Sequence, residues 1–167
     1  KRRPKHNHLT LLAQNETGYR NLLKMASIGA EEGYYYEPTI DHDVLNRHSE
    51  GVIAMSGCMG SEVSQYLLKG QKEQALKTAE WFKEHYPGRY YIEMHYHGIE
   101  EQKSILIPGL YDIAKKLDLP MVCANDVHYL EQEDWKVHKL HISMRDQDKD
   151  NAVSGKFQAY QTKNFHL

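Results

Sequence analysis

Side chains that can bind metal or transfer protons follow several apolar runs of this chain. Asp126 and His128 come two residues apart after the run 121–124, which is preceded by Leu-Pro and predicts a short buried strand. If the strand continued, this carboxylate and imidazole would point to one face, where they could hold a metal ion or orient a proton transfer. The alternative is a helix N-cap aspartate beside a surface histidine.

Cys58 and a histidine pair stand in comparable places. Cys58 follows the apolar run 51–57 and precedes an expected helix start, where a thiolate has a lowered pKa and can ligate a metal. The alternative is a small buried thiol. His95 and His97 close the aromatic run 89–95, and they are either a metal-binding pair or one structural and one exposed histidine.

Apolar runs alternate with stretches of helical periodicity, which indicates an α/β fold with mostly parallel strands. Strands are expected at 8–13, 51–57, 89–95 and around 121, and helices at 19–33, from 41, at 61–68, 72–85, 100–117 with a bend near 108–109, and 132–142. In a parallel α/β barrel the carboxyl ends of the strands form one face, where chemistry collects. The cysteine, histidine and aspartate side chains should therefore meet there, and together they suit zinc or a similar transition metal.

The composition limits the class of protein. The 167 residues suit one domain, and a hydrophobic content of 40% with a charged content of 26% is ordinary for a soluble protein. The net charge of −2 argues against this segment gripping DNA by itself. Two cysteines make no disulfide framework, so a reducing cytoplasm is expected, and no signal peptide or long apolar segment indicates a membrane.

Four blocks, in order, resemble the polymerase and histidinol phosphatase (PHP) domain of the bacterial DNA polymerase III alpha subunit: 8–22, 50–58, 91–98 and 119–129. The resemblance implies an irregular seven-stranded (βα)7 barrel that holds a metal cluster. In many bacterial replicases this domain is a metal-dependent 3′–5′ exonuclease or a structural relic of one. By position, His8, Cys58, Asp126 and His128 match ligands of the cluster, and no catalytic residue is assigned. His8 fits the strand-end pattern least well, because it precedes its strand.

The resemblance also predicts how the chain is organised. Residues 1–156 would form the latter two-thirds of a PHP domain, with the earlier ligands upstream, and 157–167 would lead toward a polymerase palm. The implied parent is a cytoplasmic DNA-directed DNA polymerase, a nucleotidyltransferase of DNA replication, with DNA and other replicase subunits as partners and no membrane. Zinc, manganese or iron would occupy the PHP site, and magnesium would serve polymerisation. The isolated chain is expected to have little or no nuclease activity.

Two other functions remain open from the sequence. One is a stand-alone PHP phosphoesterase that acts on a small phosphate ester. The other is a non-catalytic module that braces the polymerase. Metal content of the intact domain would separate the brace from the nuclease.

Overall fold

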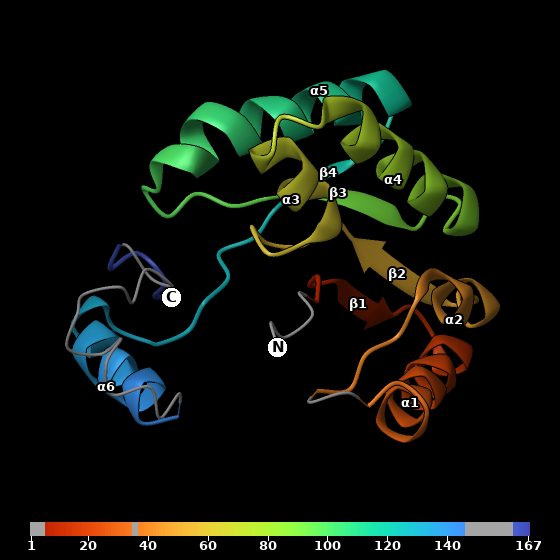
Figure 1. Ribbon diagram of the computed structural model, residues 1–167, viewed down its shortest axis with the longest axis horizontal. Coiled ribbons are helices and arrows are strands. Elements are labelled where there is room, and N and C mark those ends of the chain that lie inside the picture. The colour runs from red at the N-terminus through yellow and green to blue at the C-terminus, as the bar shows by residue number, and fades with distance from the viewer. Residues whose placement is uncertain (1–5, 35–36, 146–161) are drawn as a thin grey trace.

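The structure is a computed structural model that describes residues 6–34, 37–145 and 162–167, and it has a mixed α/β architecture (Figure 1). The elements are β1 (Thr10–Ala13), α1 (Glu16–Glu31), α2 (His42–Arg47), β2 (Val52–Met55), α3 (Glu62–Leu68), α4 (Lys72–His85), β3 (Tyr90–Met94), a π-helical turn (Gln102–Leu106), α5 (Ile107–Leu117), β4 (Met121–Cys123), a 3-10 turn (Gln132–Asp134) and α6 (Trp135–Arg145). Each strand and helix expected from the sequence is present. The expected polar loop 146–154 and residues 157–161 of the expected link lie outside the described residues.

Side-chain caps begin three of the helices. Asn15, Asp41 and Ser61 each accept a hydrogen bond from the backbone N–H three residues further along the chain. These bonds satisfy N–H groups of the first turn, which have no partner within the helix. The cap at Asp41 confirms the helix start predicted there.

The helix predicted over 100–117 is interrupted slightly earlier than expected. A π-helical turn covers Gln102–Leu106, and α5 begins at Ile107 with Pro108 in its first turn. Proline has no N–H and collides with the carbonyl four residues before it, so a regular α-helix cannot pass through it. At a helix start the same residue is tolerated, and the irregular turn therefore precedes the proline.

The four strands form one sheet in the order β1-β2-β3-β4. β1 pairs antiparallel with β2, with Thr10 opposite Met55, whereas β2, β3 and β4 run parallel. The start of β1 therefore lies at the same edge as the carboxyl ends of the other strands. This edge is where the sequence predicted the chemistry to collect.

Most of the hydrophobic core lies between the sheet and the helices α3, α4 and α5, which Figure 1 shows together above it, and Met25 of α1 with Val44 and Leu45 of α2 complete it. Alternate residues of β2 and β3 supply the sheet side, namely Val52, Ala54, Tyr90 and Ile92, all at most 1% exposed. Helical positions such as Val63, Ala79 and Leu110 supply the other side. Burial of this apolar surface fixes the strands, and with them the loops at their ends.

The described strands form an open sheet, and closure into a seven-stranded barrel stays a prediction. α6 lies apart from α3, α4 and α5 and beside the C-terminal residues (Figure 1). Among the described residues, no helix combines the length and apolar character needed to cross a membrane.

Candidate metal centre

His8 and Cys58 lie side by side at the edge where β1 begins and β2 ends. The Nδ1 of His8 is 3.4 Å from the Sγ of Cys58. The backbone N–H of His8 donates to the carbonyl of Gly60 over 3.0 Å, which holds this segment against the turn after β2. His8 precedes its strand, but β1 is antiparallel, so its start reaches the same edge as the end of β2. The sequence position of His8 is therefore compatible with the site.

A buried carboxylate, Glu93 of β3, fixes the ring of His95. Its Oε1 lies 2.9 Å from Nε2 of His95, and its Oε2 accepts the backbone N–H of Gly57 over 3.1 Å. The side chains of His95 and Glu93 are only 7% and 6% exposed. Burial by itself raises the pKa of Glu93, but the hydrogen bond and charge of His95, with further hydrogen bonds, outweigh burial and lower the pKa. An ionised carboxylate only accepts, so Nε2 of His95 donates to it.

The other ring nitrogen of His95 faces a second carboxylate. Nδ1 is buried and has no hydrogen-bond partner among the described residues, and Oδ2 of Asp126 lies 3.8 Å away, beyond hydrogen-bond distance. In the neutral ring, the proton on Nε2 leaves a lone pair on Nδ1, and this lone pair then faces a negative oxygen, which is unfavourable without a cation or proton between them. Cys58, Glu93 and His95 also line a cavity of about 10 Å³. That volume is close to the room one water molecule needs.

Asp126 and His128 approach each other, with 3.4 Å between Oδ1 and Nε2. The strand does not continue to them, because β4 ends at Cys123. Instead Asp126 has a φ of 44°, in the left-handed region that aspartate adopts more readily than most residues. The predicted meeting of the two side chains is therefore observed, but a turn produces it. The N-cap alternative fails, since Glu131 caps the next helical turn.

The lowered pKa expected for Cys58 is wrong for the metal-free protein. Burial raises the pKa of this thiol, and the negative charges of Asp126 and Glu93 raise it further. The Gly60 N–H, 3.4 Å from the sulfur, opposes this effect without cancelling it. A thiol that stays protonated must release its proton on binding a metal, so binding would be stronger at higher pH.

His97 is structural, whereas His95 faces the candidate centre. His97 is fully buried. Its Nε2 donates to the carbonyl of Asn125 over 2.8 Å, and its Nδ1 accepts from Gln102 over 3.0 Å. Both ring nitrogens are thus engaged by protein groups. Because His95 is also buried, the alternative of one structural and one exposed histidine is wrong.

The separations resemble those between ligands of one tetrahedral zinc ion. Bonds of about 2.1 Å to nitrogen or oxygen and about 2.3 Å to sulfur put such ligand atoms about 3.4 to 3.6 Å apart. The His8–Cys58 and Asp126–His128 distances are both 3.4 Å, and the His95–Asp126 distance is 3.8 Å. Yet within residues 6–34, 37–145 and 162–167, no three or more His, Cys, Asp or Glu side chains are grouped so that they could hold an ion. The candidate centre thus consists of ligand pairs along one edge, not a closed shell.

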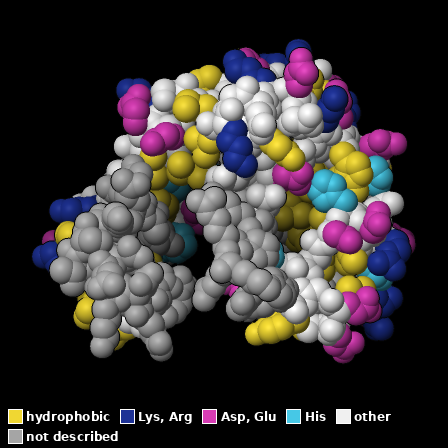
Figure 2. Space-filling view, viewed as in Figure 1, with side chains coloured by type: hydrophobic (Ala, Val, Ile, Leu, Met, Phe, Trp, Pro, Cys, Tyr) yellow, Lys and Arg dark blue, Asp and Glu magenta, His cyan; other side chains and the backbone are white. Residues whose placement is uncertain are grey.

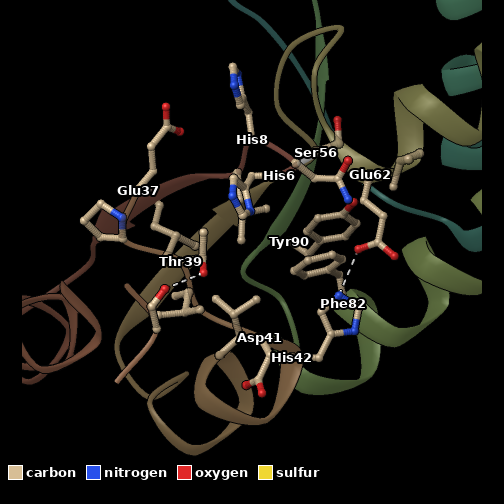
Figure 3. A pocket seen from close by; sticks show the side chains of 18 residues that line it. His6, His8, Glu37, Thr39, Asp41, His42, Ser56, Glu62, Phe82 and Tyr90 are labelled. Atoms are coloured by element: carbon tan, nitrogen blue, oxygen red, sulfur yellow. Dashed lines mark hydrogen bonds and ion pairs between the residues drawn. The ribbon is translucent and has the colours of Figure 1, made fainter. Parts of the chain in front are cut away.

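A larger cavity of about 890 Å³ borders His8 (Figure 3). His42 and Glu62 lie in its wall, with 2.9 Å between Nε2 and Oε2. Tyr90 also lines it, stacks on Phe82 with ring centroids 5.0 Å apart, and has a buried hydroxyl without a partner among the described residues. The volume is in the range of pockets that hold small ligands. The sequence did not indicate this cavity, because its wall combines residues from many elements.

Sequence reasoning missed Glu93 as a site residue. It is 5% exposed, and its backbone N–H donates to Oγ of Ser56 over 2.8 Å. A charged residue inside an otherwise apolar strand is a signal that could have identified it, because such a group is buried only with partners. Its position two residues before His95 follows the same spacing that selected Asp126 and His128.

Comparison with known proteins assigns the class. The family model of the PHP domain matches residues 1–97, which is more than half of the chain. The chain therefore belongs to the PHP domain family. This confirms the resemblance that the four sequence blocks indicated.

The related proteins are DNA polymerase III alpha subunits. The chain is 43% identical to that of Deinococcus radiodurans over 138 residues, 38% identical to that of Thermus aquaticus over 138 residues, and 31% identical to that of Aquifex aeolicus over 140 residues. These matches cover 83%, 83% and 84% of this chain, but only 10%, 11% and 12% of the relatives. Most of this chain therefore matches a segment that makes up only about a tenth of each of those subunits.

Proposed function

We propose that this chain is part of the PHP domain of a replicative DNA polymerase and that His8, Cys58, Asp126 and His128 ligate a divalent metal there. The thiolate, imidazole and carboxylate donors suit zinc, manganese or iron, and magnesium would serve polymerisation elsewhere in the parent enzyme. In the intact domain the metal would support 3′–5′ exonucleolytic cleavage of DNA. When bound, such ions activate water and stabilise the leaving oxygen of a phosphodiester.

The orphaned Nδ1 of His95 carries this proposal. A buried nitrogen lone pair that faces the carboxylate of Asp126 is a defect in a metal-free protein and a ligand in a metal-bound one. Glu93 holds the opposite ring nitrogen, which is how carboxylates orient metal-binding histidines. We therefore include His95 as a further candidate donor.

The residues of the chain have separate tasks in this proposal. Cys58 gives up its proton to bind the metal, and Asp126 supplies negative charge between two imidazoles. His8 links the centre to the 890 Å³ cavity, through which a substrate can approach. Lys and Arg side chains are interspersed with Asp and Glu on the face seen in Figure 2, without a field of one sign. Other parts of the parent polymerase and its replicase partners would therefore bind the DNA.

Metal content tests the ligand assignment. Wild-type protein, Cys58→Ser and Cys123→Ser are loaded with zinc, dialysed and analysed by mass spectrometry. Cys123 is the matched control, since it is an exposed cysteine at the end of β4. We expect Cys58→Ser alone to lose the metal. Equal zinc in all three proteins would refute the assignment.

Nuclease activity tests the role of the domain. We expect the 167-residue chain with manganese to leave a 3′-labelled DNA intact, because two ligand pairs do not position several ions. A complete polymerase subunit that contains this chain, as long as the relatives named above, should cleave the DNA. Its Asp126→Asn variant should not. Robust cleavage by the 167-residue chain would contradict the expected dependence on further ligands.

A non-catalytic brace is the second candidate function. The observation in its favour is that the described residues hold no closed group of three ligands. A brace predicts that the PHP domain of the parent protein carries no metal and that altering this domain lowers polymerase stability, not nuclease activity. The small-ester phosphoesterase has no such support, because the relatives named above are polymerase subunits.

The domain limits form part of the proposal. The four-stranded sheet would belong to an irregular (βα)7 barrel, which needs strands beyond the four described. Residues 1–156 would belong to the PHP domain and 157–167 would lead toward the polymerase palm. The parent would work in the cytoplasm, where DNA replication takes place in bacteria.

A further inference from the structure

Residues 162–167, here called the tail, lie along residues 124–130, here called the ligand loop. The backbone N–H of His128 donates to the carbonyl of Phe165 over 2.8 Å, and the N–H of Leu167 donates to the carbonyl of Leu130 over 3.2 Å. A parallel β-bridge joins the two segments between these bonds. The tail therefore supplies a strand-like partner to a loop that has left the sheet.

Phe165 reaches both histidines of this region. Its ring is 5% exposed and stacks on His97, with centroids 4.0 Å apart and planes at 12°. Its edge meets the ring of His128, with centroids 5.6 Å apart and planes at 67°. His97 in turn holds the carbonyl of Asn125, the residue before Asp126. One side chain thus contacts a candidate ligand and the imidazole that anchors the start of the loop.

Polar side chains tie the tail to the ends of two strands. The carbonyl of His97, just after β3, accepts from Oγ1 of Thr162 over 2.5 Å and from Nδ2 of Asn164 over 3.0 Å. On the β4 side, Nδ2 of Asn125 donates to the carbonyl of His166 over 2.6 Å. The tail therefore connects two loops. One follows β3 and carries His95, and the other is the ligand loop, which follows β4.

The ligand loop needs such support. β4 ends at Cys123, and none of the four described strands of the sheet pairs with the backbone of residues 126–129. Asp126 also adopts a left-handed conformation, which persists in a non-glycine residue only where neighbouring structure imposes it. The tail contacts the residues on both sides of Asp126, because His166 accepts a hydrogen bond from Asn125 and Phe165 accepts one from the backbone of His128.

We propose that the tail positions Asp126 and His128 for metal binding and that Phe165 is the main positioning residue. The consequence for metal binding rests on the proposed metal centre, whereas the positioning of the loop does not. Outer partners that orient metal ligands typically change metal affinity by about 10-fold to 100-fold when removed. We expect a change of about 10-fold, because Phe165 contacts only one of the ligand pairs.

The test uses Phe165→Ala, Asn164→Ala and the control Leu167→Ala in the 167-residue chain. Leu167 has a side chain that is 82% exposed, and its alanine variant keeps the backbone bond to Leu130. Amide hydrogen exchange of His128 and Tyr129 is measured in metal-free protein, with β2 amides as the internal reference. Cobalt affinity and the visible cobalt spectrum are then measured by titration. We expect about 10-fold faster exchange and about 10-fold weaker cobalt binding in Phe165→Ala, with the control unchanged.

Each outcome decides the inference. Wild-type exchange at His128 and Tyr129 together with wild-type cobalt affinity in Phe165→Ala would overturn it. If Phe165→Ala also loses protection in β2, the variant has unfolded, and Asn164→Ala then decides by the same two measurements. If the wild-type chain binds no cobalt, the proposed metal centre fails, and the exchange rates alone decide whether the tail holds the loop.

Discussion

Replacing Glu93 by glutamine tests how a buried carboxylate controls the proton of His95. A carboxylate offers two acceptor oxygens, whereas an amide offers one oxygen and one NH₂ group. The backbone N–H of Gly57 needs an acceptor, so the amide oxygen should turn to it and the NH₂ group to Nε2 of His95. Nε2 must then accept a hydrogen bond, and the ring carries its proton on Nδ1, opposite Asp126.

The magnitude follows from what the proton replaces. A proton on Nδ1 occupies the lone pair that would bind the metal and lets the ring donate to Asp126 once the 3.8 Å gap closes slightly. We expect metal affinity to fall about 10-fold to 100-fold, which is roughly 1.4 to 2.7 kcal/mol. Metal-free stability should change less, by about 1 kcal/mol, because one charged hydrogen bond is lost while a buried charge is removed.

Two measurements check the prediction. Competition with a chromophoric chelator reports zinc affinity, and nitrogen-detected NMR of the imidazole reports which ring nitrogen of His95 carries the proton. Glu62→Gln is the matched control, since Glu62 also pairs with a histidine, His42, but lies in the wall of the large cavity. The reasoning is refuted if Glu93→Gln binds zinc within twofold of the wild type and His95 keeps its proton on Nε2.

Three further substitutions have defined outcomes. A Cβ at Gly60 would lie 3.0 Å from Nδ1 of His8, so Gly60→Ala should displace that ring and weaken zinc binding about 10-fold by calorimetry while the melting temperature stays nearly constant. Burial raises the pKa of Tyr86 to about 12, above the unfolded value of 10.0, so its contribution to stability is complete below pH 10 and is lost as the pH rises toward 12. Tyr86→Phe removes the hydrogen bond of the tyrosine hydroxyl. In urea titrations its free energy of unfolding should therefore be lower than that of the wild type by about 1 kcal/mol at pH 8, and by less at pH 11. Asp126→Asn should abolish zinc binding yet raise the metal-free melting temperature by about 1 to 2 °C in calorimetry, because it removes the negative charge that faces Nδ1 of His95 and suits a left-handed backbone.

The secondary structure was predictable because its signals are local. Apolar periodicity and cap residues placed α4 and the start of α2 close to their observed bounds. The antiparallel direction of β1 could not be predicted, since direction depends on pairing with residues about 40 positions away. That direction also decides whether His8 belongs to the site, which the sequence left uncertain.

The chemistry of the site was predictable only in its donor types. Cys58, Asp126 and His128 follow strands in sequence, and parallel strands bring their ends together. The raised pKa of Cys58 was missed because it arises from burial of the sulfur, with a further contribution from two carboxylates, and only the fold produces both. The structural role of His97 was equally hidden, because Asn125 and Gln102 engage its ring from other elements.

In the metal-free protein, several features at this edge of the sheet are unfavourable for stability. Asp126 raises the pKa of a half-buried thiol, faces a buried nitrogen lone pair and has a left-handed backbone. The lone pair beside a carboxylate and the left-handed backbone each cost free energy in a protein that only has to fold, and a simple substitution such as asparagine would relieve both. A cation placed among these groups would turn repulsion into ligation and leave the tail and Glu93 as its outer supports. Repulsion that one cation would remove therefore supports the proposed metal binding over the proposed bracing role.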